Sequence, residues 1–307
     1  MSGTLPDPQS DVWSEWLLHR RHADDPAFDE VVRAAIDRFA DRVLDRAQLG
    51  PDMTLADIGS GEGLIAFRAI ERVGPSLRVL LTDISAPMLR HAEALAIERK
   101  VQRQCSFLQC AAEQIGAIHD GAVDVVTTRA VLAYVRDKRA ALREFHRILK
   151  PGGRISIAEP IFQDEAFVAR ALKELIDTRP IESHEPFLPL MHRWKAAQFP
   201  DTVEKVANSP IANYSERDLL RFVQESGFAE IHLELHIDVM PSIITSWDVF
   251  LGSSPHPLAP PLKDILAEQF SAAERQLFEQ VLRPTIEARK YVTTDRIAYL
   301  NAIKPYA

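Results

Sequence analysis

The chain has 307 residues, of which 46% are hydrophobic and 26% charged, a balance typical of globular proteins with a sizeable core. Its formal net charge of −8 and its short basic runs disfavour a nucleic-acid partner, because chains that neutralise phosphates usually carry an excess of Lys and Arg. No apolar run approaches the roughly 20 residues that a bilayer requires, so no membrane association is expected.

The first 50 residues predict helices. Apolar residues recur at helical spacing from Val12 to Leu44, and Gly50-Pro51 ends the pattern. We interpret residues 1–50 as an N-terminal helical cap and residues 51–307 as the main domain. By analogy, a helical extension of this kind suggests a homodimer.

From Thr54 to Glu159 short β-rich runs alternate with amphipathic helices. Strands are predicted at Thr54–Ile58, Arg78–Thr82, Ser106–Gln109, Val123–Thr127 and Arg154–Ala158, and helices at Leu64–Val73, Ala86–Lys100 and Lys138–Leu149. Alternation of this kind, with apolar strands, predicts a parallel sheet covered by helices on both faces.

The alternation stops after Pro160. Residues 161–210 and 241–292 are rich in proline and in helical patterns, and we interpret them as insertions that form a lid and acceptor site. Between them, Ser215–Ser226 predicts a helix and Ile231–Val239 a strand. The chain closes on a predicted strand at Arg296–Ile303.

The two cysteines favour a reducing compartment. Cys105 and Cys110 are five residues apart in an apparent strand, so their side chains should point to opposite faces and remain unpaired. The first eleven residues lack the basic start and apolar stretch of a signal peptide. We therefore predict a cytoplasmic protein.

A glycine-rich turn follows the first predicted strand, with the sequence Asp57-Ile58-Gly59-Ser60-Gly61-Glu62-Gly63. Glycines let a ligand approach the backbone, and the following helix offers free N–H groups. Dinucleotide sites use the spacing G-x-G-x-x-G around a pyrophosphate, whereas this turn has G-x-G-x-G. The Asp57 carboxylate would repel a pyrophosphate and attract a cationic ligand.

A second acid ends the next predicted strand. Asp83, 20 residues after Gly63, is placed to accept both hydroxyls of a ribose, as acids do in NAD sites too. Ile84 and Met88 either pack on an adenine or belong to the core. An NAD-dependent oxidoreductase therefore remains an alternative, which Asp57 and the glycine spacing disfavour.

Residues 54–159 resemble the class I S-adenosylmethionine-dependent methyltransferases of the small-molecule type. The resemblance rests on ordered signals: Asp57–Gly63, Asp83, Cys110-Ala111-Ala112-Glu113, Val123-Asp124-Val125-Val126 and Leu149-Lys150-Pro151-Gly152-Gly153-Arg154. It implies S-adenosylmethionine as cofactor and a Rossmann-like, seven-stranded, mostly parallel sheet whose last strand is antiparallel. Segments outside the shared core often build the acceptor pocket of such enzymes.

The resemblance also implies roles for single residues. Asp57, Gly59, Ser60, Gly61, Gly63 and Asp83 would bind the cofactor, with Ile84, Met88, Ala112 and Glu113 around the adenine, and Thr128 and Arg129 beside the methionine part. Ala111 stands where family members often have an acid. Arg129 either binds a carboxylate or forms a salt bridge within the fold.

Three residues are candidates for catalysis: Glu159, Tyr134 and His184. Glu159 ends the fifth strand and either holds the acceptor or makes a structural hydrogen bond. His192, Trp194 and Trp247 are weaker acceptor-site candidates. Trp13, Trp16, Arg20 and His22 form either a lid over the cofactor or helix core. No metal-ligand spacing is present.

The sequence thus predicts methyl transfer from S-adenosylmethionine to a small-molecule acceptor by in-line displacement at O, N, S or C. A base is required only if the acceptor must lose a proton. The alternatives are an NAD-dependent oxidoreductase, a non-catalytic binding module, and a methyltransferase that acts on protein or nucleic acid.

Overall fold

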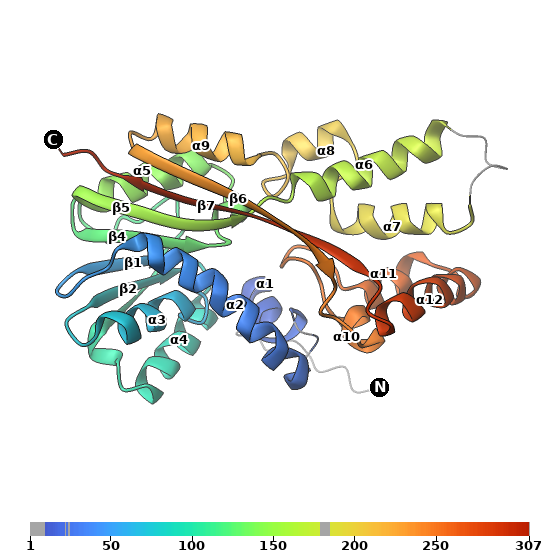
Figure 1. Ribbon diagram of the computed structural model, residues 1–307, viewed down its shortest axis with the longest axis horizontal. Coiled ribbons are helices and arrows are strands. Elements are labelled where there is room, and N and C mark those ends of the chain that lie inside the picture. The colour runs from blue at the N-terminus through green and yellow to red at the C-terminus, as the bar shows by residue number, and fades with distance from the viewer. Residues whose placement is uncertain (1–9, 22, 24, 179–184, 307) are drawn as a thin grey trace.

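The computed structural model describes residues 10–21, 23, 25–178 and 185–306. Its centre is a seven-stranded sheet with the strand order β3-β2-β1-β4-β5-β7-β6, in which only β7 runs antiparallel to the rest (Figure 1). The strands are β1 Thr54–Ile58, β2 Arg78–Asp83, β3 Cys105–Gln109, β4 Val123–Arg129, β5 Leu149–Pro160, β6 Ala229–Pro241 and β7 Val292–Ile303. The predicted fold class is confirmed.

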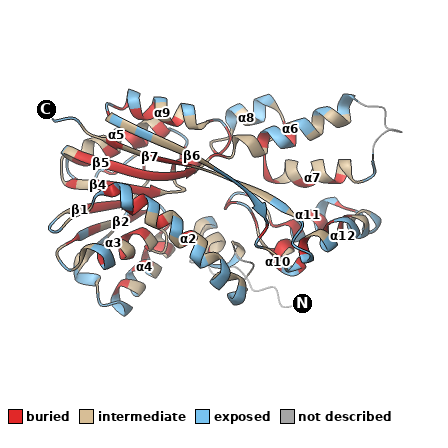
Figure 2. Ribbon diagram, viewed as in Figure 1, coloured by how far each residue is buried: buried red, intermediate tan, exposed pale blue. Residues whose placement is uncertain are grey.

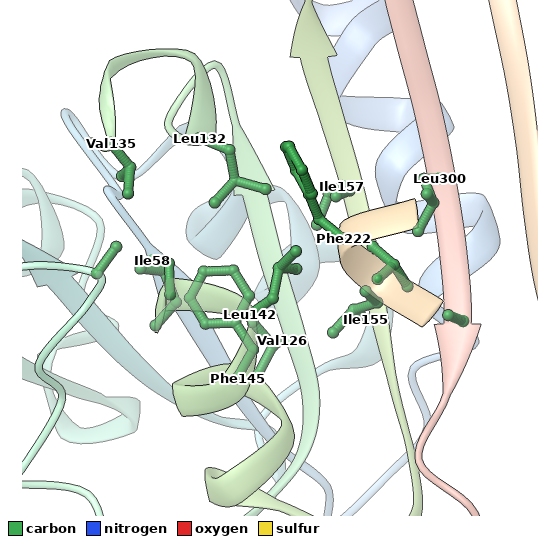
Figure 3. Close-up of a cluster of buried hydrophobic side chains, with 14 of the residues drawn as sticks. Ile58, Val126, Leu132, Val135, Leu142, Phe145, Ile155, Ile157, Phe222 and Leu300 are labelled. Carbon is green, nitrogen blue, oxygen red and sulfur yellow. The ribbon is translucent and has the colours of Figure 1, made fainter. Parts of the chain in front are cut away.

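Helices cover both faces of the sheet. One face carries α2 Pro26–Ala47, α3 Leu64–Val73 and α4 Ala86–Glu98, and the other carries α5 Lys138–Ile148 and α9 Glu216–Glu225. Strand side chains alternate between the two cores: Ile155 and Ile157 face α5 and α9, whereas Ala158 faces the α2 side. Figure 3 shows the first of these cores, with Phe145 of α5 beside Ile58 and Val126.

The strands β6 and β7 run beyond the rest of the sheet. β5 pairs with β7 only as far as Ile297, so the last residues of β6 pair with Val292–Arg296 alone. This two-stranded extension is largely exposed on β6, as Figure 2 shows, and it carries the second insertion away from the sheet (Figure 1).

The two proline-rich segments form helices that share a hydrophobic core. They contain α6 Gln163–Thr178, α7 Leu188–Gln198, α8 Val203–Asn208, α10 Trp247–Gly252, α11 Leu262–Gln269 and α12 Ala272–Glu287. Trp194 of α7 packs edge-on against Phe250 of α10 and Phe278 of α12, with centroid separations of 5.7 and 5.6 Å. Trp194 and Trp247 are therefore core residues of this layer, not acceptor-site residues.

The N-terminal segment joins this helical layer to the sheet. After α1 Val12–Glu15, residues Trp16–Arg20 form a π-helical turn, η1. The Trp16 indole N–H donates to the Ser254 carbonyl (3.1 Å), and the Arg20 guanidinium donates to the Pro257 carbonyl (2.9 Å). Residues more than 230 positions apart are thus held together over the ends of the strands.

Two smaller expectations concern the cysteines and the membrane. Both thiols are unpaired, but Cys110 follows β3 and is not part of it. Within the described ranges, no helix is long and apolar enough to cross a bilayer.

Candidate active site

A cavity of about 240 Å³ lies where β1, β2, β3 and β4 end. In open α/β sheets ligands bind outside the carboxyl ends of the strands. The wall consists of the glycine turn and start of α3, the segments that follow β2, β3 and β4, and a cap from the N-terminal segment and Pro257. These residues are Asp57–Glu62, Leu64, Ile65, Asp83, Ile84, Cys110–Glu113, Arg129–Val131, Tyr134, Val135, Trp13, Trp16, Leu17, Arg21 and Pro257.

The glycine turn brings its backbone to the cavity wall. Gly59 and Gly61 have φ angles of 64° and 54°, in the left-handed region that favours glycine. A Cβ at Gly59 would lie 2.4 Å from a Val131 methyl carbon, whereas one at Gly61 would meet only a Leu17 methyl carbon at 3.5 Å. Ser60 lines the cavity with them. The backbone at Gly59 therefore packs tightly against Val131, whereas the backbone at Gly61 has room beside it on the cavity side.

Gly63 has a different place from the one predicted. It is the N-cap of α3 with a φ of 83°, and a Cβ there would lie 2.6 Å from the Phe67 ring. It does not line the cavity, so it shapes the turn without facing a ligand.

Asp57 presents a buried carboxylate oxygen to the cavity. Oδ1 accepts a hydrogen bond from the Thr127 hydroxyl at 2.9 Å, whereas Oδ2 has no hydrogen-bond partner among the described residues. Burial raises the pKa of this carboxyl to about 7, and the Thr127 hydroxyl, the Ala66 N–H and the charge of Arg129 only partly offset that effect. A buried acceptor without a partner is costly, so this oxygen fits a ligand that donates from a cation.

Asp83 links the glycine turn to the start of α4. Its Oδ2 accepts from the Gly61 N–H and its Oδ1 from the Ser85 N–H, both at 2.9 Å. Each carboxylate oxygen has a second lone pair, and the side chain lines the cavity, so both oxygens can still accept from a ligand.

The two apolar candidates beside Asp83 separate in the structure. Ile84 is 54% exposed and lines the cavity. Met88 is fully buried and does not reach it, because Ser85 caps α4 and turns the Met88 position into the core. The prediction that Met88 packs on an adenine is therefore wrong. Ala112 and Glu113 line the cavity.

Thr128 and Glu159 hold each other and the loop that follows β4. Both are fully buried, and the Thr128 hydroxyl donates to Glu159 Oε1 at 2.8 Å. The N–H groups of Val131 and Ala133 donate to Glu159 Oε2 at 3.0 and 3.1 Å. Neither residue lines the cavity. The structure corrects both expectations: Thr128 does not contact a cofactor site, and Glu159 positions a loop and does not touch an acceptor.

The remaining catalytic candidates have different outcomes. Tyr134 lines the cavity, with its ring edge-on to Trp13 at 5.2 Å. Burial raises the pKa of its phenol, and the nearby Glu159 carboxylate raises it further, so Tyr134 stays protonated near neutral pH. His184 lies outside the described residues.

The cap contributes residues that the sequence reasoning missed, chiefly Leu17, Arg21 and Pro257. Of the predicted lid residues, Trp13 and Trp16 line the cavity, whereas Arg20 ties the cap to Pro257 from outside the wall. His22 lies outside the described residues. Arg20 and Arg21 are adjacent in the sequence, and the structure places Arg21 in the wall and Arg20 outside it. In the described part of the chain, no group of three His, Cys, Asp or Glu is placed to hold a metal ion.

Comparison with known proteins identifies the family of this chain. A family model described as "Methyltransferase domain" matches residues 49–210, more than half of the chain. The chain belongs to the class I family of S-adenosylmethionine-dependent methyltransferases. Its cofactor is S-adenosylmethionine, so the alternative of an NAD-dependent oxidoreductase loses its support.

Three proteins show the extent of this methyltransferase likeness. A tRNA 5-carboxymethoxyuridine methyltransferase of Escherichia coli K12 is 36% identical over 118 residues, which are 38% of this chain and 43% of the relative. A ubiquinone/menaquinone biosynthesis C-methyltransferase of Xanthomonas oryzae is 31% identical over 188 residues, 61% of this chain and 70% of the relative. The solved structure of YcgJ from Bacillus subtilis has a TM-score of 0.56 at 17% identity and covers 88% of this chain and 99% of its own, a likeness in fold.

Proposed function

We propose that this methyltransferase acts on a small molecule enclosed beneath the cap. The observation that carries this proposal is the partial cover that Trp13, Trp16 and Leu17 form over the cavity, with Trp16 and Arg20 tied to the second insertion. A roof held by hydrogen bonds favours an acceptor that fits inside over a polymer that lies across the strand ends. The net charge of −8 agrees with this choice.

The cavity wall divides into parts that suit the parts of the cofactor. We propose that the free Asp57 oxygen accepts from its ammonium group, that Asp83 accepts from the ribose hydroxyls, and that Ile84 and Ala112 flank the adenine. Gly59, Ser60 and Gly61 let the backbone approach closely, and Glu113 lies at the adenine side. When bound, S-adenosylmethionine supplies a methyl group already activated by a sulfonium.

The protein residues then have modest tasks, which are to align the acceptor and to exclude water. The apolar cap residues Trp13, Trp16 and Leu17 exclude water from the cavity. Tyr134 keeps its proton and can donate a hydrogen bond to the acceptor. With Glu159 fully engaged in the fold, we propose catalysis by proximity, in which no side chain of the described wall serves as a strong base.

Cofactor affinity should depend on pH through Asp57. Its pKa of about 7 means that binding an ammonium group requires loss of a proton below neutrality. Affinity should rise about 8-fold between about pH 6 and about pH 7.5. The free energy of unfolding of the ligand-free protein should change in the opposite direction. Between about pH 4 and about pH 7 the folded state keeps the Asp57 proton that the unfolded state loses, so the free energy of unfolding should fall as the pH rises through this range.

Calorimetric titration with S-adenosylhomocysteine at several pH values measures this dependence. Asp83 and Arg129 face the same site, so Asp57→Asn serves as the matched variant that removes only one titrating group. A wild-type profile that stays flat, or an equal slope in Asp57→Asn, would contradict the assignment.

The proposed function is tested by labelling. The protein is incubated with S-adenosylmethionine carrying a tritiated methyl group and with a cell extract separated into small-molecule, protein and RNA fractions. We expect label in the small-molecule fraction. Label confined to protein or RNA would overturn the proposal.

A tRNA acceptor is the second candidate, because the E. coli relative bears that activity in its name. Its similarity to this chain covers less than half of its own length, so the acceptor-binding parts are not compared. Binding to tRNA that weakens steeply with added salt, together with label in RNA, would favour this candidate.

A further inference from the structure

Two arginines in the cavity wall have no counter-ion in contact. Arg21 comes from the cap and Arg129 from the end of β4, and both line the cavity. Across residues 10–21, 23, 25–178 and 185–306, no carboxylate lies within 4.0 Å of either guanidinium, and neither group donates a hydrogen bond. The Arg21 guanidinium instead lies 5.4 Å from the centre of the Trp16 ring. Neighbouring Arg20, by contrast, is bound to the Pro257 carbonyl.

The two cations are close enough to repel each other. Burial and, to a smaller extent, the charge of Arg129 lower the pKa of Arg21 to about 9. Glu62 attracts both guanidinium groups from a distance, and Asp57 and Glu159 attract Arg129. A partly dry site that keeps two like charges without contacts is unfavourable by itself and is typical of a site that binds an anion.

The cofactor accounts for only one of these cations. S-adenosylmethionine carries a single carboxylate, on the same carbon as its ammonium group. Asp57 and Arg129 lie at the ends of the paired strands β1 and β4, line the cavity and attract each other, so they suit those two groups together. Arg21, on the cap, is attracted by Glu62 and Asp29 from a distance, but no carboxylate of the described residues is in contact with it.

We propose that Arg21 binds a carboxylate of the acceptor, and that the substrate is therefore a small carboxylic acid with an apolar or aromatic body. This inference rests on the proposed function. A guanidinium matches a planar carboxylate through two parallel hydrogen bonds. The neighbouring wall is apolar and aromatic, formed by Trp13, Trp16, Leu17 and Pro257, and it suits the body of such a molecule.

Chemical masking of carboxylates tests the inference. Half of the small-molecule extract is treated with methylamine and a carbodiimide, which convert carboxylates into neutral amides, and both halves are labelled as above. We expect wild-type incorporation to fall about 10-fold or more in the masked half. Equal label in both halves would overturn this inference and leave the proposed function standing. If the protein binds S-adenosylhomocysteine but labels neither half, the proposed function itself would be overturned.

Variants locate the effect at Arg21. For the acceptor isolated from the extract, Arg21→Met should lower kcat/KM about 100-fold, because the acceptor carboxylate would be left without its partner. Its affinity for S-adenosylhomocysteine should stay within about 3-fold of wild type. Arg33→Met, on the exposed face of α2, is the matched control and should behave as wild type in both measurements. An Arg21→Met enzyme that retains wild-type kcat/KM would overturn the inference.

Thermal unfolding gives a readout that does not depend on turnover. Removal of an uncompensated cation should leave ligand-free Arg21→Met at least as stable as wild type, because the repulsion with Arg129 is lost. The isolated acceptor, added with S-adenosylhomocysteine, should raise the Tm of wild type but not of Arg21→Met. An equal rise in both proteins would contradict the role of Arg21.

Discussion

Replacing Asp83 with alanine is expected to weaken binding of S-adenosylmethionine about 100-fold or more, since hydrogen bonds to a charged group contribute about 1.5–3 kcal/mol each. Two causes act together. The ribose hydroxyls lose their proposed acceptor, and the N–H groups of Gly61 and Ser85 lose theirs. The glycine turn therefore loses the tie that connects it to the start of α4.

Calorimetric titration of Asp83→Ala with S-adenosylmethionine measures this loss, and circular dichroism checks that the variant is folded. Asp83→Asn keeps one oxygen and should bind with intermediate affinity. Asp41→Ala is the matched control: Asp41 pairs with Arg68 and Arg72 on the helical surface and does not line the cavity. Wild-type affinity in a folded Asp83→Ala would refute the assignment of the ribose site.

Glu159→Ala is expected to lower the free energy of unfolding by about 3–5 kcal/mol, because it removes a buried carboxylate and strands its donors. Those donors are the Thr128 hydroxyl and the N–H groups of Val131 and Ala133. The loop that follows β4 supplies Val131, Tyr134 and Val135 to the cavity wall. The substitution should therefore also disturb the site, although Glu159 touches no ligand.

Unfolding in urea, followed by fluorescence and by circular dichroism, measures the change. Thr128→Val removes one donor of the same network and should lower the free energy of unfolding by only about 1 kcal/mol. It therefore serves as the reference for the loss of a single hydrogen bond. Rescue distinguishes the two roles of Glu159: Glu159→Gln retains one acceptor oxygen and should recover part of the stability and of the cofactor affinity. A Glu159→Ala protein with wild-type stability and abolished turnover would instead indicate a catalytic acid or base.

Most elements of the sheet could be predicted because their signals are local. Alternation of apolar runs located β1, and the predicted bounds of α3 agree with the structure at both ends. A strand was predicted too short where only pairing with a neighbour extends it. β7 begins at Val292, four residues before the predicted start, because β6 pairs with it beyond the rest of the sheet. Neither residue type nor periodicity reveals such a partner.

The positions of single site residues also agree with the prediction where local signals suffice and differ from it where distant contacts decide. Asp57 and Asp83 lie at the carboxyl ends of parallel strands, next to the crevice where ligands bind in such sheets. Met88 lies four residues from the cavity-lining Ile84, Thr128 is next to the cavity-lining Arg129, and Glu159 lies at the end of β5, yet all three are buried and do not line the cavity. Which face a side chain takes depends on the cap of α4 and on the donors of a distant loop.

By itself, then, the sequence determined the fold class, the family and the turn and acids that mark the cofactor side, because these depend on short-range spacing and backbone chemistry. Only the tertiary structure decided which arginine enters the cavity and that two insertions separated in the chain form one core with Trp194 at its centre. Those features arise from side chains that meet across more than 50 residues of chain, as Trp194 and Phe250 do. Their contacts depend on complementary shape, which no local pattern encodes.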